Sequence, residues 1–286
     1  MAKKKQLIVP IFIPQYGCPH QCVFCNQQRI TGSAKLPEAS EVTDTIDAYL
    51  RTWKGSGRKE VAFYGGSFTG LDMNTQERLL KAAFRFIEEG LICSIRISTR
   101  PDYITVEGLA LLKRYGVETV ELGVQSMSDE VLRLSGRGHT AEDTSRAVTL
   151  LKKYGFRVGL QLMPGLPGDS AETILYTAVR AVELRPDFVR IYPTVVVKDT
   201  PLEKMYLNAM YRPWPLNEMV KICRGIVSLF NAENIPLIRL GLQHTETLEQ
   251  NIVAGPYHPS FRELVKGRQA LKEAVCYEKT FYHNAV

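Results

Sequence analysis

Short apolar segments alternate with amphipathic helical patterns along most of this chain, and that alternation restricts its fold more than any other feature. The segments of strand length are LIVPIF near residue 9, VAFYGG at 61–66, SIRIS at 94–98, TVELGV at 119–124, RVGLQL at 157–162, FVRIYP at 188–193 and PLIRL at 236–240. Strands separated by crossover helices pair in parallel, in a sheet that closes as a barrel or stays open and twisted. The sequence therefore predicts an α/β fold whose chemistry lies just after the strands.

A weak internal repeat supports this prediction. LLKRYGVETVELGV at 111–124 resembles LLKKYGFRVGLQLM at 150–163, and each combines a helix end, a Tyr-Gly stop and a strand. The pattern at 75–89 predicts a further helix with Thr75 as its N-terminal cap. The repeating unit is thus a helix followed by a strand.

The net charge and the hydropathy pattern restrict the possible partners and the cellular location of the protein only slightly. The 286 residues carry a formal net charge of +6, which permits an anionic partner without identifying it. No apolar run approaches the roughly 18 residues of a membrane span. The run after Lys3, Lys4 and Lys5 is too short and proline-broken for a signal peptide. We therefore expect a cytoplasmic protein that does not enter a membrane.

The regular alternation stops at KDTPLEKMYLNAMYRPWPLN, residues 198–217, where prolines and aromatic residues cluster. This stretch predicts either a lid or a domain boundary. We place a core domain over residues 1–205 and a C-terminal extension, packed on that core, over residues 206–286.

Three of the six cysteines crowd into GCPHQCVFCNQQ at 17–28, directly after the first strand. Cys18, Cys22 and Cys25 can surround one metal centre. Three interpretations remain open: an iron–sulfur cluster with one iron left for an outside ligand, a zinc site that lacks a second ligand pair, and a redox dithiol. The other cysteines are expected to be small buried hydrophobic residues; they are Cys93, Cys223 and Cys276.

Polar motifs follow the next strands at the predicted active edge. Gly65 and Gly66 in YGGSFTG lack a Cβ, so their backbone can approach a ligand amino group closely. Arg100 in STRPD and Gln125 in ELGVQS offer a bidentate fork and an amide to a ligand. Arg137 in SGRGHT stands just beyond the fourth strand.

CPHQCVFC resembles the CxxxCxxC signature of the radical S-adenosylmethionine (SAM) superfamily, including the aromatic Phe24 before the last cysteine. The resemblance implies a 4Fe-4S cluster on Cys18, Cys22 and Cys25, with the amino and carboxylate groups of SAM on the fourth iron. One electron from the reduced cluster would then split SAM into methionine and a 5′-deoxyadenosyl radical. YGGSFTG is similar to the GGE-type motif that holds the SAM amine, with Ser67 replacing the acidic residue. The implied fold is a partial parallel (β/α)6-type TIM barrel.

A longer series of motifs resembles the radical SAM domain of the Elongator catalytic subunit family over residues 7–205; it consists of YGGSFTG, STRPDYI, ELGVQSMSDEVL, GRGHT, LLKKYGF, MPGLPGD and RPDFVRIYPTVVVKDTPLE. That family modifies wobble uridine of transfer RNA (tRNA) and adds a C-terminal acetyltransferase domain, for which we expect too few residues here. Ser98 stands where the family has an acidic residue, and Gln161 stands where it has a histidine. Contacts with SAM or with the acceptor are therefore expected to differ.

The resemblance implies a radical SAM enzyme whose cofactor contacts include Phe24, Gly65, Gly66, Ser67, Ser98, Arg100, Gln125, Arg137 and Gln161. Expected partners are an electron donor of the flavodoxin or ferredoxin type and tRNA. Tyr192 and Lys198 are candidates for the substrate side. Three aromatic residues could stack an unpaired base, namely Trp53, Tyr211 and Trp214.

Two other functions remain open on the sequence alone. Coproporphyrinogen oxidases share the GVQS and GLP features, which would make the chain a radical SAM oxidoreductase acting on a small molecule. A non-catalytic scaffold around a bound metal is the second alternative. The substrate, the identity of the electron donor and the oligomeric state are not determined by the sequence.

Overall fold

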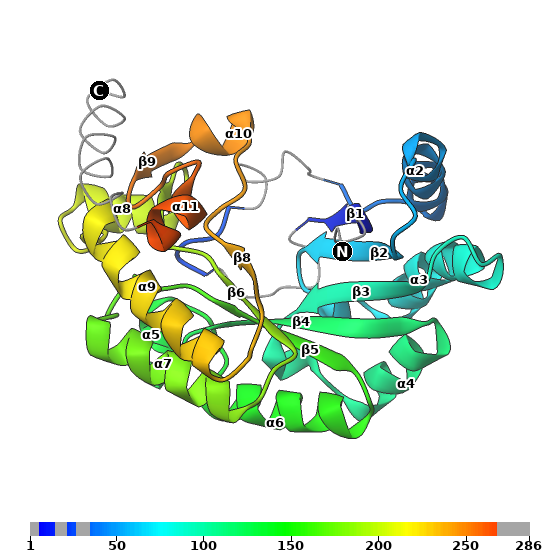
Figure 1. Ribbon diagram of the computed structural model, residues 1–286, viewed down its shortest axis with the longest axis horizontal. Helices are drawn as coiled ribbons and strands as arrows, with labels where there is room; N and C mark the ends of the chain where they lie inside the picture. Colours follow the sequence, from blue (N-terminus) through cyan, green and yellow to red (C-terminus); the bar gives the residue numbers. More distant parts are fainter. Residues whose placement is uncertain (1–5, 15–21, 27–34, 268–286) are drawn as a thin grey trace. The chain divides into compact units, whose positions relative to one another are not determined.

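A seven-stranded sheet forms the framework of the protein. The computed structural model describes residues 6–14, 22–26 and 35–267 (Figure 1). The strands of this sheet are β1 (Leu7–Ile13), β2 (Lys59–Gly65), β3 (Ser94–Thr99), β4 (Val117–Gln125), β5 (Arg157–Leu162), β6 (Phe188–Ile191) and β8 (Leu237–Leu240). They lie in the order β1-β2-β3-β4-β5-β6-β8. Each corresponds to a strand predicted from the sequence, and the predicted α/β fold with parallel strands is confirmed.

Helices follow most of the strands, as the alternating pattern predicts. They are α2 (Ala39–Thr52), α3 (Met73–Glu88), α4 (Val106–Arg114), α5 (Asp129–Leu134), α6 (Ala141–Lys153), α7 (Ala171–Glu183), α8 (Pro201–Leu207), α9 (Leu216–Ala232), α10 (Glu246–Glu249) and α11 (Phe261–Lys266), with short 3-10 turns η1 (Phe68–Gly70) and η2 (Pro101–Tyr103). None of the helices in the described ranges has both the length and the hydropathy needed to cross a bilayer.

The chain divides into two compact units. Of the described residues, the first unit holds 6–14, 35–123 and 146–158, and the second holds 22–26, 124–145 and 159–267. The boundary predicted after residue 205 falls within α8 of the second unit. The division into a core over 1–205 and an extension over 206–286 stays a prediction.

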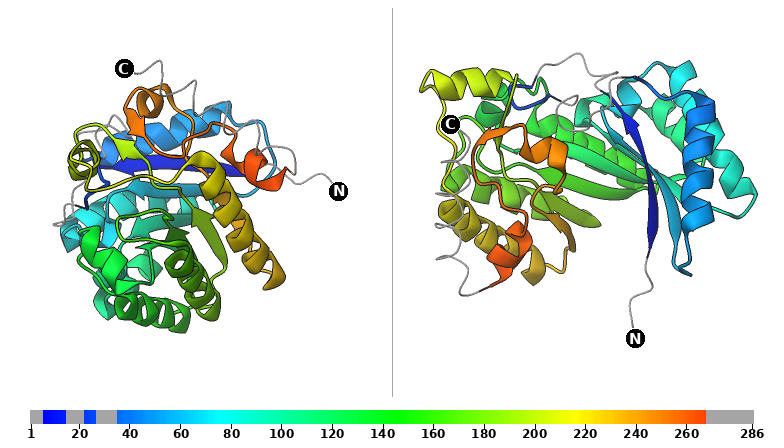
Figure 2. Two further views of the ribbon diagram at one scale, coloured as in Figure 1. Left: turned by 90° about the vertical axis from the view of Figure 1, so that its left-hand side faces the viewer. Right: turned by 90° about the horizontal axis from the view of Figure 1, so that it is seen from above.

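In the first unit, β1 to β4 carry helices α2, α3 and α4 on one face (Figures 1 and 2). Helix α3 begins at Met73, and the side chain of Asp72 accepts a hydrogen bond of 3.0 Å from the backbone N–H of Thr75. The prediction of Thr75 as the cap is therefore wrong. A carboxylate placed three residues before a free N–H caps it well, and Asp72 lies before the first apolar position of the helical pattern.

A buried ion network joins β2, β3 and β4 in the first unit. Glu60, Arg96 and Glu121 are all nearly inaccessible to solvent. Arg96 Nε donates to Glu60 Oε2 at 3.0 Å, and its Nη1 donates to Glu121 Oε1 at 3.1 Å. Burial raises the pKa of Glu60, but Arg96 and Arg58 outweigh it and hold that pKa below its ordinary value. Arg96 on β3 thus bridges carboxylates on the two strands beside it, and Arg58 supplies a second cation to Glu60.

In the second unit, β5, β6 and β8 pair in parallel and pack against α7 and α9 (Figure 1). The ring of Phe188 lies over Gly159, its Cα partner on β5. A Cβ at Gly159 would lie only 2.2 Å from Phe188 Cε2. The glycine is therefore required by the packing of an aromatic ring onto the adjacent strand.

Replacing Gly159 with alanine is expected to lower the free energy of unfolding by about 1–3 kcal/mol, because the new methyl group overpacks against Phe188. Gly225 in α9 is the matched control, since nothing lies within 4 Å of a Cβ built there. Gly225→Ala should raise stability by roughly 0.5–1 kcal/mol, because alanine favours the helix. Urea denaturation measures both, and effects of the same sign at the two positions would contradict the packing argument.

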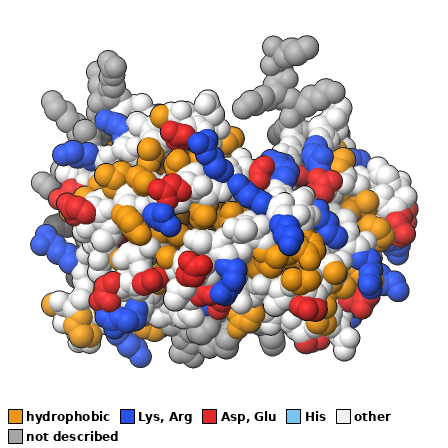
Figure 3. All heavy atoms as spheres, turned by 90° about the horizontal axis from the view of Figure 1, so that it is seen from below, with side chains coloured by type: hydrophobic (Ala, Val, Ile, Leu, Met, Phe, Trp, Pro, Cys, Tyr) orange, Lys and Arg blue, Asp and Glu red, His pale blue; other side chains and the backbone are white. Residues whose placement is uncertain are grey.

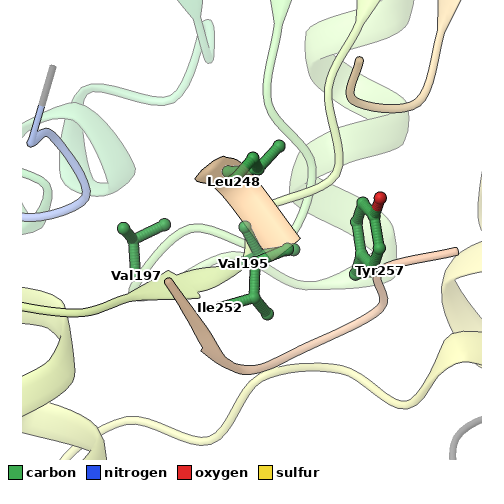
Figure 4. Close-up of a cluster of buried hydrophobic side chains, with 5 residues drawn as sticks. All are labelled: Val195, Val197, Leu248, Ile252 and Tyr257. Atoms are coloured by element: carbon green, nitrogen blue, oxygen red, sulfur yellow. The ribbon is translucent and has the colours of Figure 1, made fainter. Parts of the chain in front are cut away.

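A small antiparallel ribbon belongs to the second unit and pairs β7 (Val196–Val197) with β9 (Ile252–Ala254). Apolar side chains of the ribbon, of α10 and of the segments next to the ribbon form the cluster shown in Figure 4: Val195, Val197, Leu248, Ile252 and Tyr257. The hydroxyl of Tyr257 donates to Glu249 at 2.9 Å, so a buried ring keeps its polar end satisfied.

Of the cysteines outside the motif at 17–28, one is not buried as the sequence predicts. Cys223 lies fully buried in α9, as predicted, and burial raises the pKa of its thiol. Cys93 is exposed instead, because it stands in the turn just before β3 rather than within the strand. Cys276 lies outside the described residues.

Candidate cofactor site

Residues 22–26, the described part of the cysteine loop, belong to the second unit and form a tight turn. The backbone N–H of Cys25 donates to the carbonyl of Cys22 at 3.0 Å. The backbone of Val23 is held at both of its polar groups: its N–H donates to Ser135 O at 3.0 Å, and its carbonyl accepts from Leu202 N at 2.8 Å. The turn is thereby tied to the C-terminal end of α5 and to α8, which fixes the backbone that carries Cys22 and Cys25. Cys18 lies outside the described residues.

A buried arginine contacts the first of these thiols. Arg137 Nη1 lies 3.4 Å from Cys22 Sγ, and both side chains are buried. Arg137 stands between Gly136 and Gly138, which have φ values of 64° and 71°. Two left-handed residues fold the backbone tightly here, which glycine permits at little cost. The sequence had singled out Arg137 but had not predicted its contact with the thiol.

The aromatic residue within the turn has an apolar environment. Phe24 and Val23 pack against a buried cluster formed by Val196, Leu202, Tyr211 and Ala254. The side chain of Asn26 donates to the carbonyl of Asp199 at 3.3 Å and anchors the far end of the turn. The stretch at 198–217, predicted as a lid or a boundary, therefore supports the cysteine turn, and the choice between those two roles stays open.

Tyr211 does not have the role predicted from the sequence. Its side chain is buried, and its hydroxyl donates to the Gly165 carbonyl at 2.6 Å. Burial, together with the nearby Asp169, raises the pKa of this phenol. A buried ring with a satisfied hydroxyl cannot stack on an unpaired base, so Tyr211 is removed from that set of candidates.

In the first unit, the glycine motif YGGSFTG lies at the end of β2. Gly65 has φ 103°, a conformation that disfavours any residue with a Cβ. Ser67 Oγ lies 2.9 Å from Thr99 Oγ1 and accepts a hydrogen bond of 3.3 Å from the backbone N–H of Arg100. The motif is thus bonded directly to the end of β3. Thr99 is a further candidate for the site that the sequence did not single out, although its place beside Ser98 and Arg100 in STRPD was a usable signal.

The end of β3 presents a serine and an arginine. Within the described residues, Ser98 Oγ is buried and has no hydrogen-bond partner. The guanidinium of Arg100 donates two hydrogen bonds, each of 3.0 Å, to the Asp102 carboxylate. Sequence reasoning missed Asp102 as this partner, although an acidic residue two positions after an arginine is a recognisable signal. The predicted contact between Arg100 and SAM stays a prediction.

Two glutamines end the neighbouring strands of the second unit. Gln125 has φ 67°, and its carbonyl accepts from Met163 N at 2.9 Å. In the described part of the chain, Gln125 Oε1 is buried and has no partner. Gln161 lies near the end of β5 in register with Arg190 on β6. A left-handed non-glycine residue at a strand end is often found at a functional site.

These residues fit a negatively charged sulfur cluster and a ligand with hydrogen-bond donors. The cation of Arg137 lies beside a cysteine sulfur, which suits a thiolate that binds iron. Ser98 Oγ in the first unit and Gln125 Oε1 in the second are each buried without a partner among the described residues, and each could accept a hydrogen bond from an amine or hydroxyl donor. Among the described residues no group of three metal-ligating side chains is complete, since Cys18 is not among them.

Comparison with known proteins decides the family. The profile of the radical SAM superfamily matches residues 12–181. The chain belongs to the radical SAM superfamily. The profile of the radical SAM C-terminal domain matches residues 186–273. The family named from the cysteine motif is therefore confirmed.

Curated relatives of this radical SAM chain include tRNA-modifying proteins. The tRNA uridine(34) acetyltransferase of Methanocaldococcus infernus is 27% identical over 255 residues, which cover 75% of this chain and 48% of the relative. Elongator complex protein 3 of Homo sapiens is 30% identical over 306 residues, covering 91% of this chain and 55% of the relative. The chain thus spans about half the length of these relatives. An uncharacterised protein of Methanocaldococcus jannaschii is 32% identical, covering 77% of this chain and 70% of the relative.

Solved structures share the fold of this radical SAM chain. The Elp3 protein of Methanocaldococcus infernus aligns with a TM-score of 0.73 and 24% identity, covering 95% of this chain and 64% of the other. Coproporphyrinogen III oxidase of Escherichia coli aligns with a TM-score of 0.60 and 20% identity, covering 80% of this chain and 53% of the other. At these identities the likeness shows the fold alone, and it agrees with the predicted radical SAM architecture.

Proposed function

We propose that the chain is a radical SAM enzyme that binds a 4Fe-4S cluster through Cys18, Cys22 and Cys25 and cleaves SAM reductively. The observation that carries the proposal is the buried contact of Arg137 with Cys22 Sγ at 3.4 Å, within the cysteine turn of a radical SAM family member. A structural zinc site normally has four protein ligands, and this turn supplies three cysteines at most. The cluster interpretation therefore explains the thiols and the arginine together.

The residues of the chain have separable tasks in this proposal. Phe24 shields the cysteine turn from water by packing on the apolar cluster beneath it. Gly65 and Gly66, next to the buried Ser67, leave backbone carbonyls accessible for the SAM amine. When bound and reduced, the cluster supplies the electron that splits SAM into methionine and a 5′-deoxyadenosyl radical.

The remaining polar groups would hold SAM by its donors and its carboxylate. Ser98 Oγ and Gln125 Oε1 accept hydrogen bonds from hydroxyl or amine groups of the ligand. We propose that Arg100 or Arg137 contributes a cation to the binding of its carboxylate. Gln161 replaces the family histidine, and we propose that it bonds the adenosyl moiety or the acceptor through its amide.

Anaerobic purification and reduction test the enzyme proposal. A brown protein with about four iron and four sulfide per chain, which releases 5′-deoxyadenosine from SAM after reduction, is the expected result. A protein of the flavodoxin or ferredoxin type should be able to supply the electron in place of a chemical reductant. A colourless protein that holds zinc and releases no 5′-deoxyadenosine would instead support the metal-binding scaffold.

We further propose tRNA, modified at the wobble uridine, as the substrate, because relatives that share most of this chain's length carry that activity in their names. On the face drawn in Figure 3, however, the described Lys and Arg side chains are interspersed with Asp and Glu and form no continuous basic patch. On that face, the dispersed Lys and Arg side chains would contact only a few phosphate groups of a tRNA. The substrate assignment therefore needs a direct binding measurement.

Filter binding of tRNA is expected to weaken steeply with salt, with log K falling linearly against log[salt] because phosphate contacts release counterions. A change from 50 to 200 mM salt should cost at least about 10-fold for a few contacts. A flat salt response or no binding would favour a small-molecule substrate, in line with the coproporphyrinogen oxidase fold neighbour. Nucleosides of tRNA from cells with and without the gene would identify the modification.

A further inference from the structure

The strand β4 ends in a strained turn around Gln125. The backbone N–H of Ser126 donates to the carbonyl of Val124 at 2.9 Å, and the φ of Gln125 between them is 67°. A three-residue turn with positive φ at its central residue is rare and strained, so it persists only where the surrounding structure holds it. The side chain of Gln125 is buried. The direction in which its amide points therefore depends on the groups that hold this turn.

A threonine of α7 holds the turn from outside the strand. The buried stripe of α7 is Ile174, Thr177, Ala178 and Ala181. Thr177 Oγ1 accepts a hydrogen bond of 3.0 Å from the backbone N–H of Met127 and lies 3.2 Å from Ser126 Oγ. Ser126 Oγ in turn accepts a hydrogen bond of 3.1 Å from the backbone N–H of Ser128. Two hydroxyl groups thus fix the backbone that follows Gln125.

Packing alone does not require a hydroxyl at this position of α7. Thr177 and Ser126 are both completely buried, and burying a hydroxyl is unfavourable unless it forms hydrogen bonds. Valine has nearly the shape of threonine and would fill the same space without that cost. Thr144 in α6 is also completely buried, but in the described part of the chain its hydroxyl has no hydrogen-bond partner. Burial in a helix therefore does not by itself give a threonine hydroxyl a partner.

We propose that Thr177 is a positioning residue for SAM, which acts by holding the turn that orients Gln125. This inference rests on the proposed function, in which Gln125 Oε1 accepts a hydrogen bond from SAM. That oxygen is buried without a partner among the described residues, so an incoming donor would meet an acceptor already in place. Thr177 acts through Gln125 and is not expected to touch SAM. The fixed part of the site thereby extends from the end of β4 to the middle of α7.

The test is Thr177→Val in the cluster-loaded protein, with the Kd for SAM measured by calorimetry. Without the hydroxyl, a smaller fraction of molecules keeps Gln125 in its binding position. A fall of that fraction to about a tenth raises the Kd about 10-fold, which is the expected result. At saturating SAM the rate of 5′-deoxyadenosine release should stay near the wild-type rate, because only the binding-competent fraction has changed. Thr177→Ser keeps the hydroxyl and should keep the Kd within about 3-fold of the wild type.

Thr144→Val is the matched control, because it removes a buried helical hydroxyl that has no partner in the described part of the chain. It should change the Kd for SAM less than about 2-fold and should not lower the melting temperature. Hydrogen exchange without SAM gives a readout that needs no ligand: the amide of Met127 should exchange at least about 10-fold faster in Thr177→Val than in the wild type or the control. An unchanged Kd in Thr177→Val would overturn the proposal even with faster exchange, because the hydroxyl would then serve the fold alone.

A double-mutant cycle determines whether Thr177 acts through Gln125. Gln125→Asn shortens the amide side chain, and asparagine tolerates the left-handed conformation that the turn needs. In that background, Thr177→Val should raise the Kd less than about 2-fold further. Effects that multiply would mean that Thr177 acts independently of Gln125 and would overturn the proposal. If Thr177→Val does not fold, Ser126→Ala removes the other hydroxyl of the pair and should raise the Kd at least about 3-fold, and an unchanged Kd would again overturn the proposal.

Failure of the proposed function has a different signature. A wild-type protein that neither binds SAM nor releases 5′-deoxyadenosine would overturn that function and the role of Thr177 with it. A wild-type protein that binds SAM with the same Kd as Thr177→Val would overturn the role of Thr177 only.

Discussion

Replacing Cys22 with alanine is expected to abolish iron binding and 5′-deoxyadenosine release together, with activity falling more than about 100-fold to background. Two cysteines cannot retain a cubane cluster that three are proposed to hold. The fold should persist, because the turn is held by the backbone of Val23, whose hydrogen bonds to Ser135 and Leu202 do not involve the lost sulfur. Iron and sulfide content, visible absorbance and circular dichroism measure these effects on one sample.

Cys93→Ala is the matched control for this experiment. Cys93 is exposed and precedes β3, so its replacement should change neither the iron content nor the SAM cleavage. Retention of SAM cleavage by Cys22→Ala would exclude the proposed cluster. If that variant loses secondary structure, Cys22→Ser replaces it, because serine keeps nearly the same volume and a hydrogen-bonding group while offering iron a much poorer ligand.

Replacing Arg96 with methionine is expected to lower the free energy of unfolding by about 3–5 kcal/mol at neutral pH. The substitution leaves Glu60 and Glu121 buried without the cation that bridges them. Methionine keeps much of the apolar volume, so the loss measures the uncompensated charge rather than a cavity. Arg180→Ala removes an exposed pair with Glu183 and should cost less than about 1 kcal/mol.

The pH dependence of the Arg96→Met effect provides a second test. In the wild type the pKa of Glu60 is lowered, so its contribution to stability is complete above the unfolded carboxyl pKa of about 4.3 and is lost as the pH falls through the folded value. Without Arg96, only Arg58 opposes the effect of burial, so the pKa of Glu60 rises from its wild-type value and protonation relieves the variant. The stability difference should therefore shrink between about pH 7 and pH 4. A constant difference over that range would assign Arg96 a packing role only.

Most of the scaffold followed from local patterns in the sequence. Each of the seven strands lies in a short run rich in β-branched or apolar residues, and such a run needs only its own residues to be recognised. The cap of α3 was misplaced by three residues because Asp72 lies outside the apolar periodicity. Cys93 was expected to be buried because its residue type usually is, but its place in the turn before β3 exposes it.

The sequence by itself determined the family and the residue types at the site, because the spacing of Cys18, Cys22 and Cys25 and the glycines after β2 are local features. Only the tertiary structure decided which distant groups meet. The contact of Arg137 with Cys22 joins residues 115 positions apart. Likewise, the hydroxyl of Thr177 on α7 meets the backbone of Met127, which lies 50 positions earlier in the chain. Such pairings depend on strand order and on the packing of helices against the sheet, which are set by the whole fold rather than by any short segment.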